Sequence, residues 1–263
     1  MKHWISYAED GRQSIDRSAN ALELTLGVPG RRADLADLGA RARDLIVLLN
    51  GITFTEDDEI VNWTLPEVAA DLGAASWNIA SGWYKVSAAC LRSALDVSMA
   101  SLYFSIRERN SSLPGGCNRF FSEWDRGERD TPNWGEMKPI ISQQQTIQQF
   151  NATHQIDIVD LVYSHFKRLS AYTHSRQWEK GVDLPIGAMW IGDTPGYDAE
   201  LFERFLNLMK ETVGWIATLW IVNLPEILAQ DPLDAGFDRN RYAEVLFVLQ
   251  ADAALDASGV HWA

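Results

Sequence analysis

Hydrophobic residues recur along most of the chain at spacings of three and four positions, which is typical of helices with one buried face. The segment 157–176 shows this spacing most clearly, through Ile158, Leu161, Val162, Phe166, Leu169 and Tyr172. The segment 198–224 repeats the spacing, and Asp198 stands where an N-cap residue closes a first turn. These two patterns predict helices whose apolar faces share one core.

The longest helical pattern covers residues 66–109. Thr64, Pro66 and Glu67 together have the features of a helix start, with a capping hydroxyl and a proline in the first turn. We expect an interruption near Gly73. Small residues flank the apolar positions of this segment and allow close approach of a second helix, so the pattern predicts the central helix of a bundle.

The N-terminal part of the chain predicts two further helices. The first covers residues 3–26, and Asp34 is the expected N-cap of the second. The end of the second helix is ambiguous, because Asn50-Gly51 lies between two apolar runs and also fits a hairpin turn within 45–55. We favour the helix, since its apolar positions begin well before those runs.

The remaining segments are shorter and less regular. An aromatic helix is expected over 119–129, and Pro139 is expected to begin a glutamine-rich peripheral helix. A glycine- and proline-containing connection at 181–197 has alternating apolar residues that suit a short extended segment. A last helix is expected over 239–256.

These patterns together predict an all-α fold, a multi-helix bundle with long antiparallel core helices and little or no β structure. We expect the core to be formed by the helices at 76–109, 157–176 and 198–224. We expect a single helical domain over 1–263, consisting of an N-terminal helical part at 1–65, a core bundle at 66–230 and a C-terminal helix at 231–263.

Charge and cysteine content limit the function classes. The net charge of −13 argues against a broad nucleic-acid-binding face, although a local basic pocket remains compatible with it. The two cysteines, Cys90 and Cys117, form no metal or disulfide pattern, which fits a cytoplasmic protein.

The longest apolar run, 213–224, is too short to cross a bilayer, so no membrane association is expected.

Common catalytic signatures are missing from the sequence. It contains no phosphate-binding glycine loop, no dinucleotide fingerprint, no zinc-binding His pair on a helix and no nucleophile elbow. His154 with Asp157 and Asp160 with His165 have spacings that suit a metal, but no third ligand clusters with them. We therefore expect neither a metal nor another cofactor.

The densest group of polar side chains lies on the predicted helix 157–176. Arg168 and His174 stand six positions apart, and His165 precedes them on the apolar stripe. The hydroxyl-bearing residues of the group are Ser170, Tyr172 and Thr173. On an ideal helix Arg168 and His174 lie roughly 120° apart, so they converge only if the helix ends near Tyr172 or if two subunits contribute.

A second polar group lies on one face of the predicted helix 66–109. It consists of Lys85, Arg92, Asp96, Tyr103 and Arg107. Arg92 and Asp96 are four positions apart and can pair directly. This face is either a solvated surface with one ion pair, or a polar wall toward the Arg168/His174 helix in which Arg92 and Arg107 help to bind a substrate.

The stretch Arg168-Leu-Ser-Ala-Tyr-Thr-His174, on a helical chain with a long partner helix rich in small residues, resembles the HEPN superfamily. The motif of that superfamily is an arginine followed four to six residues later by a histidine. The resemblance implies a metal-independent ribonuclease of a toxin–antitoxin or phage-defence system, working as a homodimer with facing motif helices. It also implies that RNA is the substrate.

The residue types fit this chemistry. Cleavage of RNA without a metal needs a base for the 2′-hydroxyl proton and a cation for the charge on phosphorus. Histidine titrates near neutral pH and arginine presents a permanently charged fork to phosphate oxygens. His174 is thus the expected general acid/base and Arg168 the expected phosphate clamp, while Ser170, Tyr172, Thr173, His165, Arg92 and Arg107 are expected to assist in binding.

Structural roles are the alternative for the same residues. His165 then is a hydrogen-bonded core histidine, and His174 with Ser175 caps the helix C-terminus. Arg168 in this case is an exposed residue or pairs with Asp157 or Asp160. The corresponding alternative function is a non-catalytic helical interaction subunit, antitoxin-like or a sensor, that binds a protein partner. The acidic balance favours this alternative, and so does Leu169, where HEPN proteins commonly have a polar residue.

Overall fold

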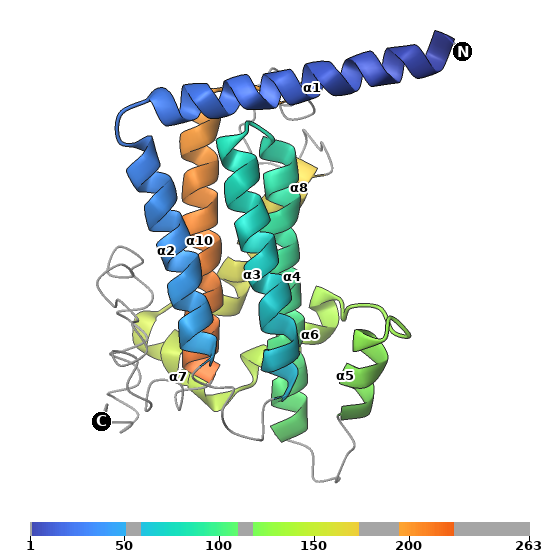
Figure 1. Cartoon of the computed structure of the whole chain (residues 1–263). Helices are drawn as coiled ribbons and strands as arrows, with labels where there is room; N and C mark the ends of the chain where they lie inside the picture. Colours follow the sequence, from blue (N-terminus) through green and yellow to red (C-terminus); the bar gives the residue numbers. More distant parts are fainter. Residues whose placement is uncertain (1, 51–58, 110–117, 174–194, 224–263) are drawn as a thin grey trace.

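A computed structural model describes residues 2–50, 59–109, 118–173 and 195–223 of the chain (Figure 1). Within these ranges 86% of residues are helical and none forms a strand, which confirms the predicted all-α bundle. The helices are α1 (Lys2–Gly27), α2 (Arg31–Asn50), α3 (Glu59–Ala80), α4 (Tyr84–Arg109), α5 (Asn118–Asp125), α6 (Trp134–Ser142), α7 (Gln145–His154), α8 (Ile158–Thr173) and α10 (Ala199–Asn223).

Long helices lie side by side and α4 contacts most of them, as expected for a central helix. α3 and α4 form an antiparallel hairpin, in which the buried hydroxyls of Thr64 and Ser101 hydrogen-bond. α10 runs parallel to α4, and the indole of Trp220 donates to the Ser98 hydroxyl across 2.7 Å. α1 crosses one end of this bundle and extends beyond it (Figure 1).

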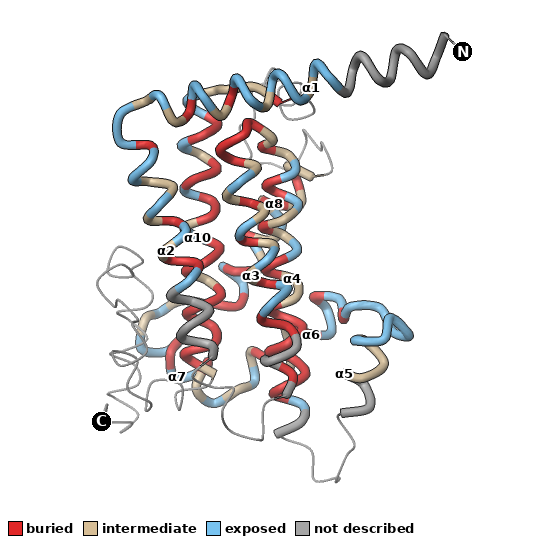
Figure 2. The backbone as a smooth tube through the Cα atoms, in the orientation of Figure 1, coloured by how far each residue is buried: buried red, intermediate tan, exposed pale blue. Residues whose placement is uncertain are grey.

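One buried cluster joins residues from α2 through α10. Figure 2 shows that the buried positions face the interior of the bundle, whereas the described part of α1 is mostly exposed. The predicted core helices all contribute to this cluster, through residues that include Leu91, Leu95, Val162, Leu169, Phe205 and Ile216, each no more than 1% exposed. Apolar burial on this scale is the main stabilising term of such a bundle.

The turn between α3 and α4 requires glycine at Gly82. Its φ is +77°, and a Cβ atom there would lie 2.4 Å from the carbonyl oxygen of Gly196. The Gly196 amide donates back to the Gly82 carbonyl across 3.4 Å. This close approach places the segment before α10 against the hairpin, where the Tyr84 hydroxyl also donates to the Asp198 carbonyl across 3.1 Å.

Two predicted helix starts were wrong. α3 begins at Glu59, and Thr64 does not cap it, because the Thr64 hydroxyl donates to the Ile60 carbonyl one turn back. α2 begins at Arg31, and the amide of Asp34, the expected N-cap, already donates to the Gly30 carbonyl. Burial explains both shifts, since Ile60 is fully buried and Arg31 is 6% exposed, with its guanidinium 3.8 Å from the ring centre of Phe202.

Two predicted boundaries within the bundle also differ. The long helical segment is interrupted at Gly82, while Gly73 lies inside α3 at an exposed position. The glutamine-rich segment forms α6 and α7, and α6 begins at Trp134 instead of Pro139 because the Asn133 side chain accepts from the Glu136 amide.

The remaining helix predictions are close to the structure. α2 continues to Asn50, as favoured over the hairpin, and Asp198 caps α10 by accepting from the Leu201 amide across 2.8 Å. The expected extended segment at 182–190 and the helix at 239–256 lie outside the described residues.

Candidate functional site

Two contacts align α8 with α10. His165 hydrogen-bonds Thr212, and the ring of Tyr172 meets that of Phe205 edge-on with centres 5.0 Å apart. Seven residues forward on α8 therefore correspond to seven residues back on α10, so the helices are antiparallel. Because His165 lies on the same stripe as Val162 and Leu169, this alignment directs its imidazole into the interface.

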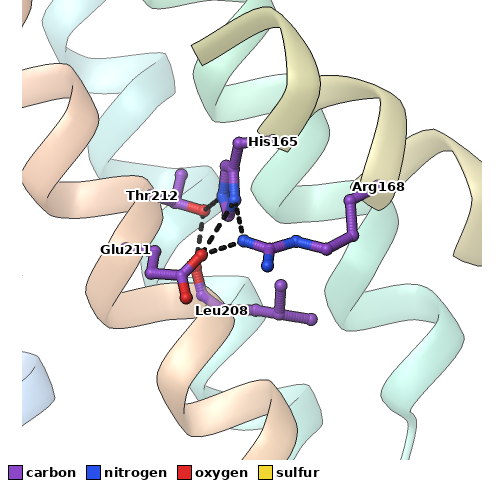
Figure 3. Close-up of polar contacts among 5 residues, drawn as sticks. All are labelled: His165, Arg168, Leu208, Glu211 and Thr212. Carbon is purple, nitrogen blue, oxygen red and sulfur yellow. Dashed lines mark hydrogen bonds and ion pairs between the residues drawn. The ribbon is translucent and has the colours of Figure 1, made fainter. Parts of the chain in front are cut away.

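A chain of hydrogen bonds passes through His165, which is 3% exposed (Figure 3). Its Nδ1 atom lies 2.6 Å from Nη2 of Arg168 and its Nε2 atom lies 2.8 Å from the Thr212 hydroxyl. A guanidinium can only donate, so Nδ1 carries the lone pair and the proton is on Nε2. The Thr212 hydroxyl accepts from Nε2 and donates to the Leu208 carbonyl across 2.8 Å.

Arg168 also forms an ion pair with Glu211, which no sequence pattern singled out. Nη2 of Arg168 donates to Oε2 of Glu211, and this oxygen lies 3.2 Å from Nδ1 of His165. One guanidinium nitrogen, with its two hydrogens, thus joins two acceptors. About 40% of the Arg168 side chain and 44% of the Glu211 side chain are exposed, so the pair lies at the surface in front of the buried histidine.

The electrostatics of this cluster keep the imidazole neutral. Burial, together with the smaller effect of the adjacent charge of Arg168, lowers the pKa of His165 to about 3. Burial also lowers the pKa of the Arg168 guanidinium, which nevertheless remains charged at neutral pH. The expectation of a hydrogen-bonded core histidine is confirmed, and any substrate would meet Arg168 before His165.

The predicted partners of Arg168 were wrong. Asp160 instead pairs with Lys138 of α6, and the Asp157 side chain accepts from the Asp160 amide across 3.0 Å. Glu211 is 43 positions from Arg168 and occupies a surface position of α10. Its part in the site depends on the alignment of two helices, which local sequence does not reveal. Thr212 lies within the predicted helix 198–224.

The hydroxyl-bearing candidates lie near the end of α8. The Thr173 hydroxyl donates to the Ser170 carbonyl across 2.9 Å, and the Tyr172 ring contributes to the core against Phe205. The Ser170 hydroxyl is buried without a hydrogen-bond partner among the described residues. His174 lies outside the described residues, directly after the last residue of α8.

The candidates on α4 fall at two different places. Arg92 pairs with Asp96 at 3.8 Å, as predicted, and its guanidinium lies 5.1 Å from the ring centre of Phe166 on α8. Arg107 is 15 positions further along, about 22 Å on a helix, and its Nη1 donates to the Tyr103 hydroxyl across 2.7 Å. Arg92 therefore faces α8, whereas Arg107 is not brought together with it.

Asp96 connects α4 to α6. It accepts from the Trp134 indole across 3.1 Å, and the Trp134 ring lies against Tyr163 and Phe166 of α8. Burial raises the pKa of Asp96, and this effect outweighs the opposing effects of Trp134 and Arg92. This part of the expected polar wall is thus a half-buried link among three helices.

Among the described residues no group of three or more His, Cys, Asp or Glu side chains is arranged to hold a metal ion. No helix in the described ranges is long and apolar enough to span a bilayer.

Comparison of the whole chain with protein-family models, curated proteins and solved structures finds no match.

Proposed function

We propose that this chain is a metal-independent, HEPN-like ribonuclease that acts in the cytoplasm as part of a toxin or phage-defence system. In this proposal Arg168 binds the scissile phosphate and His174 is the general acid/base. The protein works as a homodimer, with two motif helices at one RNA-binding site.

The observation that carries the proposal is the state of Arg168. Its guanidinium is partly exposed, yet His165 and Glu211 hold it in a defined position between α8 and α10. A positioned cation at the surface is what stabilisation of a phosphorane requires, because its orientation does not have to be established during the reaction. His174 follows α8 directly, so the two motif residues are close in sequence to the same helix end.

A second candidate function is a non-catalytic interaction subunit. It is favoured by the pairing of Arg168 with Glu211, which neutralises the charge that would bind phosphate. In this alternative Arg168, His165 and Glu211 join α8 to α10 and have no substrate. Protein partners, not RNA, would then be the ligands of the chain.

Expression in a bacterial host separates the two functions. Growth and total RNA on a gel are compared for the wild type, His174→Ala and the matched histidine variant His154→Gln, which removes an imidazole from α7. The proposal predicts growth arrest and RNA fragmentation with the wild type and His154→Gln, and loss of both effects with His174→Ala. Arrest that persists in His174→Ala would contradict the role of His174.

A further inference from the structure

The environment of Arg168 also indicates how access to this cation is controlled. The Glu211 carboxylate accepts a hydrogen bond from Nη2 of Arg168, whose guanidinium also contacts the buried His165 (Figure 3). A carboxylate and a phosphodiester both present anionic oxygens to the donor fork of a guanidinium. Whichever anion is bound, the other must leave that position.

We propose that the Glu211 carboxylate occupies the phosphate-binding position of Arg168 in the free protein and is displaced by RNA. This inference rests on the proposed function, because it assigns an occupant to the same cation. Glu211 is thereby an intramolecular competitor that lowers the affinity of the site for phosphate.

The guanidinium keeps a second support when the carboxylate leaves. Nδ1 of His165 accepts from Arg168 across 2.6 Å, and His165 is anchored in turn by Thr212 across 2.8 Å. Both His165 and Thr212 are buried, so this support does not depend on the exposed carboxylate. Arg168 therefore stays positioned for a phosphate after exchange.

The exchange itself requires little energy. Both members of the Arg168–Glu211 pair have about two fifths of their side-chain surface in contact with solvent. Ion pairs with this exposure contribute little net stability, because water and salt screen them and side-chain entropy opposes them. A phosphate that makes additional contacts can displace the carboxylate without unfolding the surrounding helices.

The test measures binding of a short single-stranded 2′-O-methyl oligoribonucleotide, which cannot be cleaved because it lacks a free 2′-hydroxyl. Glu211→Gln is compared with the wild type and with Glu200→Gln. Glu200 lies on the same helix, 11 positions or about 16 Å from Glu211, and pairs with Arg204. Both variants change the net charge equally. We expect Glu211→Gln to bind about three- to tenfold more tightly than the other two proteins.

Two further variants complete the test. The tighter binding of Glu211→Gln should disappear when it is combined with Arg168→Gln, because no guanidinium then remains to bind the phosphate. Glu211→Asp keeps the charge but shortens the side chain, so it should tighten binding by a smaller factor, and it decides the question if Glu211→Gln does not fold. Equal binding of Glu211→Gln and Glu200→Gln, or a gain that survives without Arg168, would overturn the inference.

Cleavage of unmodified RNA, measured in parallel, keeps the two proposals apart. Tighter binding in Glu211→Gln without cleavage by any variant would contradict the ribonuclease and leave the competitor role of Glu211 intact. Cleavage that depends on Arg168, with binding unaffected by Glu211→Gln, would support the ribonuclease and reject the competitor.

Discussion

Arg168 donates a hydrogen bond to Nδ1 of His165 across 2.6 Å, and this contact determines the state of the imidazole. Because the guanidinium cannot accept a hydrogen bond, His165 is neutral and carries its proton on Nε2, which donates a hydrogen bond to the Thr212 hydroxyl. A histidine that lies beside the candidate phosphate-binding arginine therefore supports that arginine and is not itself a base.

The tautomer of His165 is directly measurable. We expect the ¹⁵N chemical shifts of its ring to show a neutral Nε2–H imidazole throughout pH 5 to 8, because burial and Arg168 lower its pKa to about 3. In Arg168→Met the pKa should rise, since the positive charge is lost while the Glu211 carboxylate remains 3.2 Å from Nδ1. Arg204→Met is the matched control, and an imidazolium in the wild type at pH 6 would refute this assignment.

The same pKa shift predicts acid sensitivity. The unfolded chain binds a proton at His165 near pH 6.5, whereas the folded chain does so only near pH 3. Below pH 6.5 the unfolded state thus binds more protons, and the contribution of His165 to stability falls as pH falls, by up to about 1.4 kcal/mol per pH unit.

His165→Asn isolates this contribution, because the variant has no titratable group at the position. The difference in unfolding free energy between wild type and variant, from urea titrations, should be constant above pH 7 and shrink between pH 6 and pH 4. A difference that does not change over this range would show that His165 protonates equally in both states.

Thr212 is expected to matter through its hydroxyl. The residue is fully buried, and Thr212→Val leaves the Nε2–H of His165 without an acceptor, at a cost of about 1–3 kcal/mol. Thr212→Ser retains the hydroxyl and should cost less. Equal unfolding free energies for the two variants, measured in urea, would mean that the hydrogen bond contributes nothing.

Gly82 should tolerate no side chain. Gly82→Ala combines an unfavourable positive φ with a Cβ atom 2.4 Å from the Gly196 carbonyl oxygen, so we expect a loss of at least about 2 kcal/mol in unfolding free energy. Gly73→Ala is the matched control inside α3, where an added Cβ atom meets nothing within 4 Å. This substitution should raise the unfolding free energy by roughly 0.5–1 kcal/mol. Similar effects of the two substitutions on thermal unfolding would contradict this explanation.

The helical pattern sufficed to predict the bundle, because the spacing of residues such as Val162 and Leu169 reflects the face that each helix buries. Helix starts were less predictable. The motif at Thr64 has the composition of a cap, yet α3 begins at Glu59, five residues before Thr64, because Ile60 is buried in the core. Tertiary contacts thus outweighed a local signal.

The candidate site could be predicted only in part. The density of polar groups around Arg168 was visible in the sequence, and so was the position of His165 on the apolar stripe. Glu211 was not, because an exposed glutamate on a helix is common and its proximity to Arg168 follows from the alignment of α8 with α10. Arg168 and Glu211 are 43 positions apart in the sequence, so only the folded structure shows that they belong to one cluster.

Cleavage of a fluorescent single-stranded RNA by purified protein, with EDTA present, decides whether this protein is a metal-independent ribonuclease. We expect activity in the wild type that falls at least about 100-fold in His174→Ala and in Arg168→Gln, the scale expected for loss of an acid–base group or a positioned cation. His154→Gln and Arg204→Gln, the matched histidine and arginine controls, should retain it. Activity that is absent from the wild type, or that survives in folded His174→Ala and Arg168→Gln, would contradict the ribonuclease.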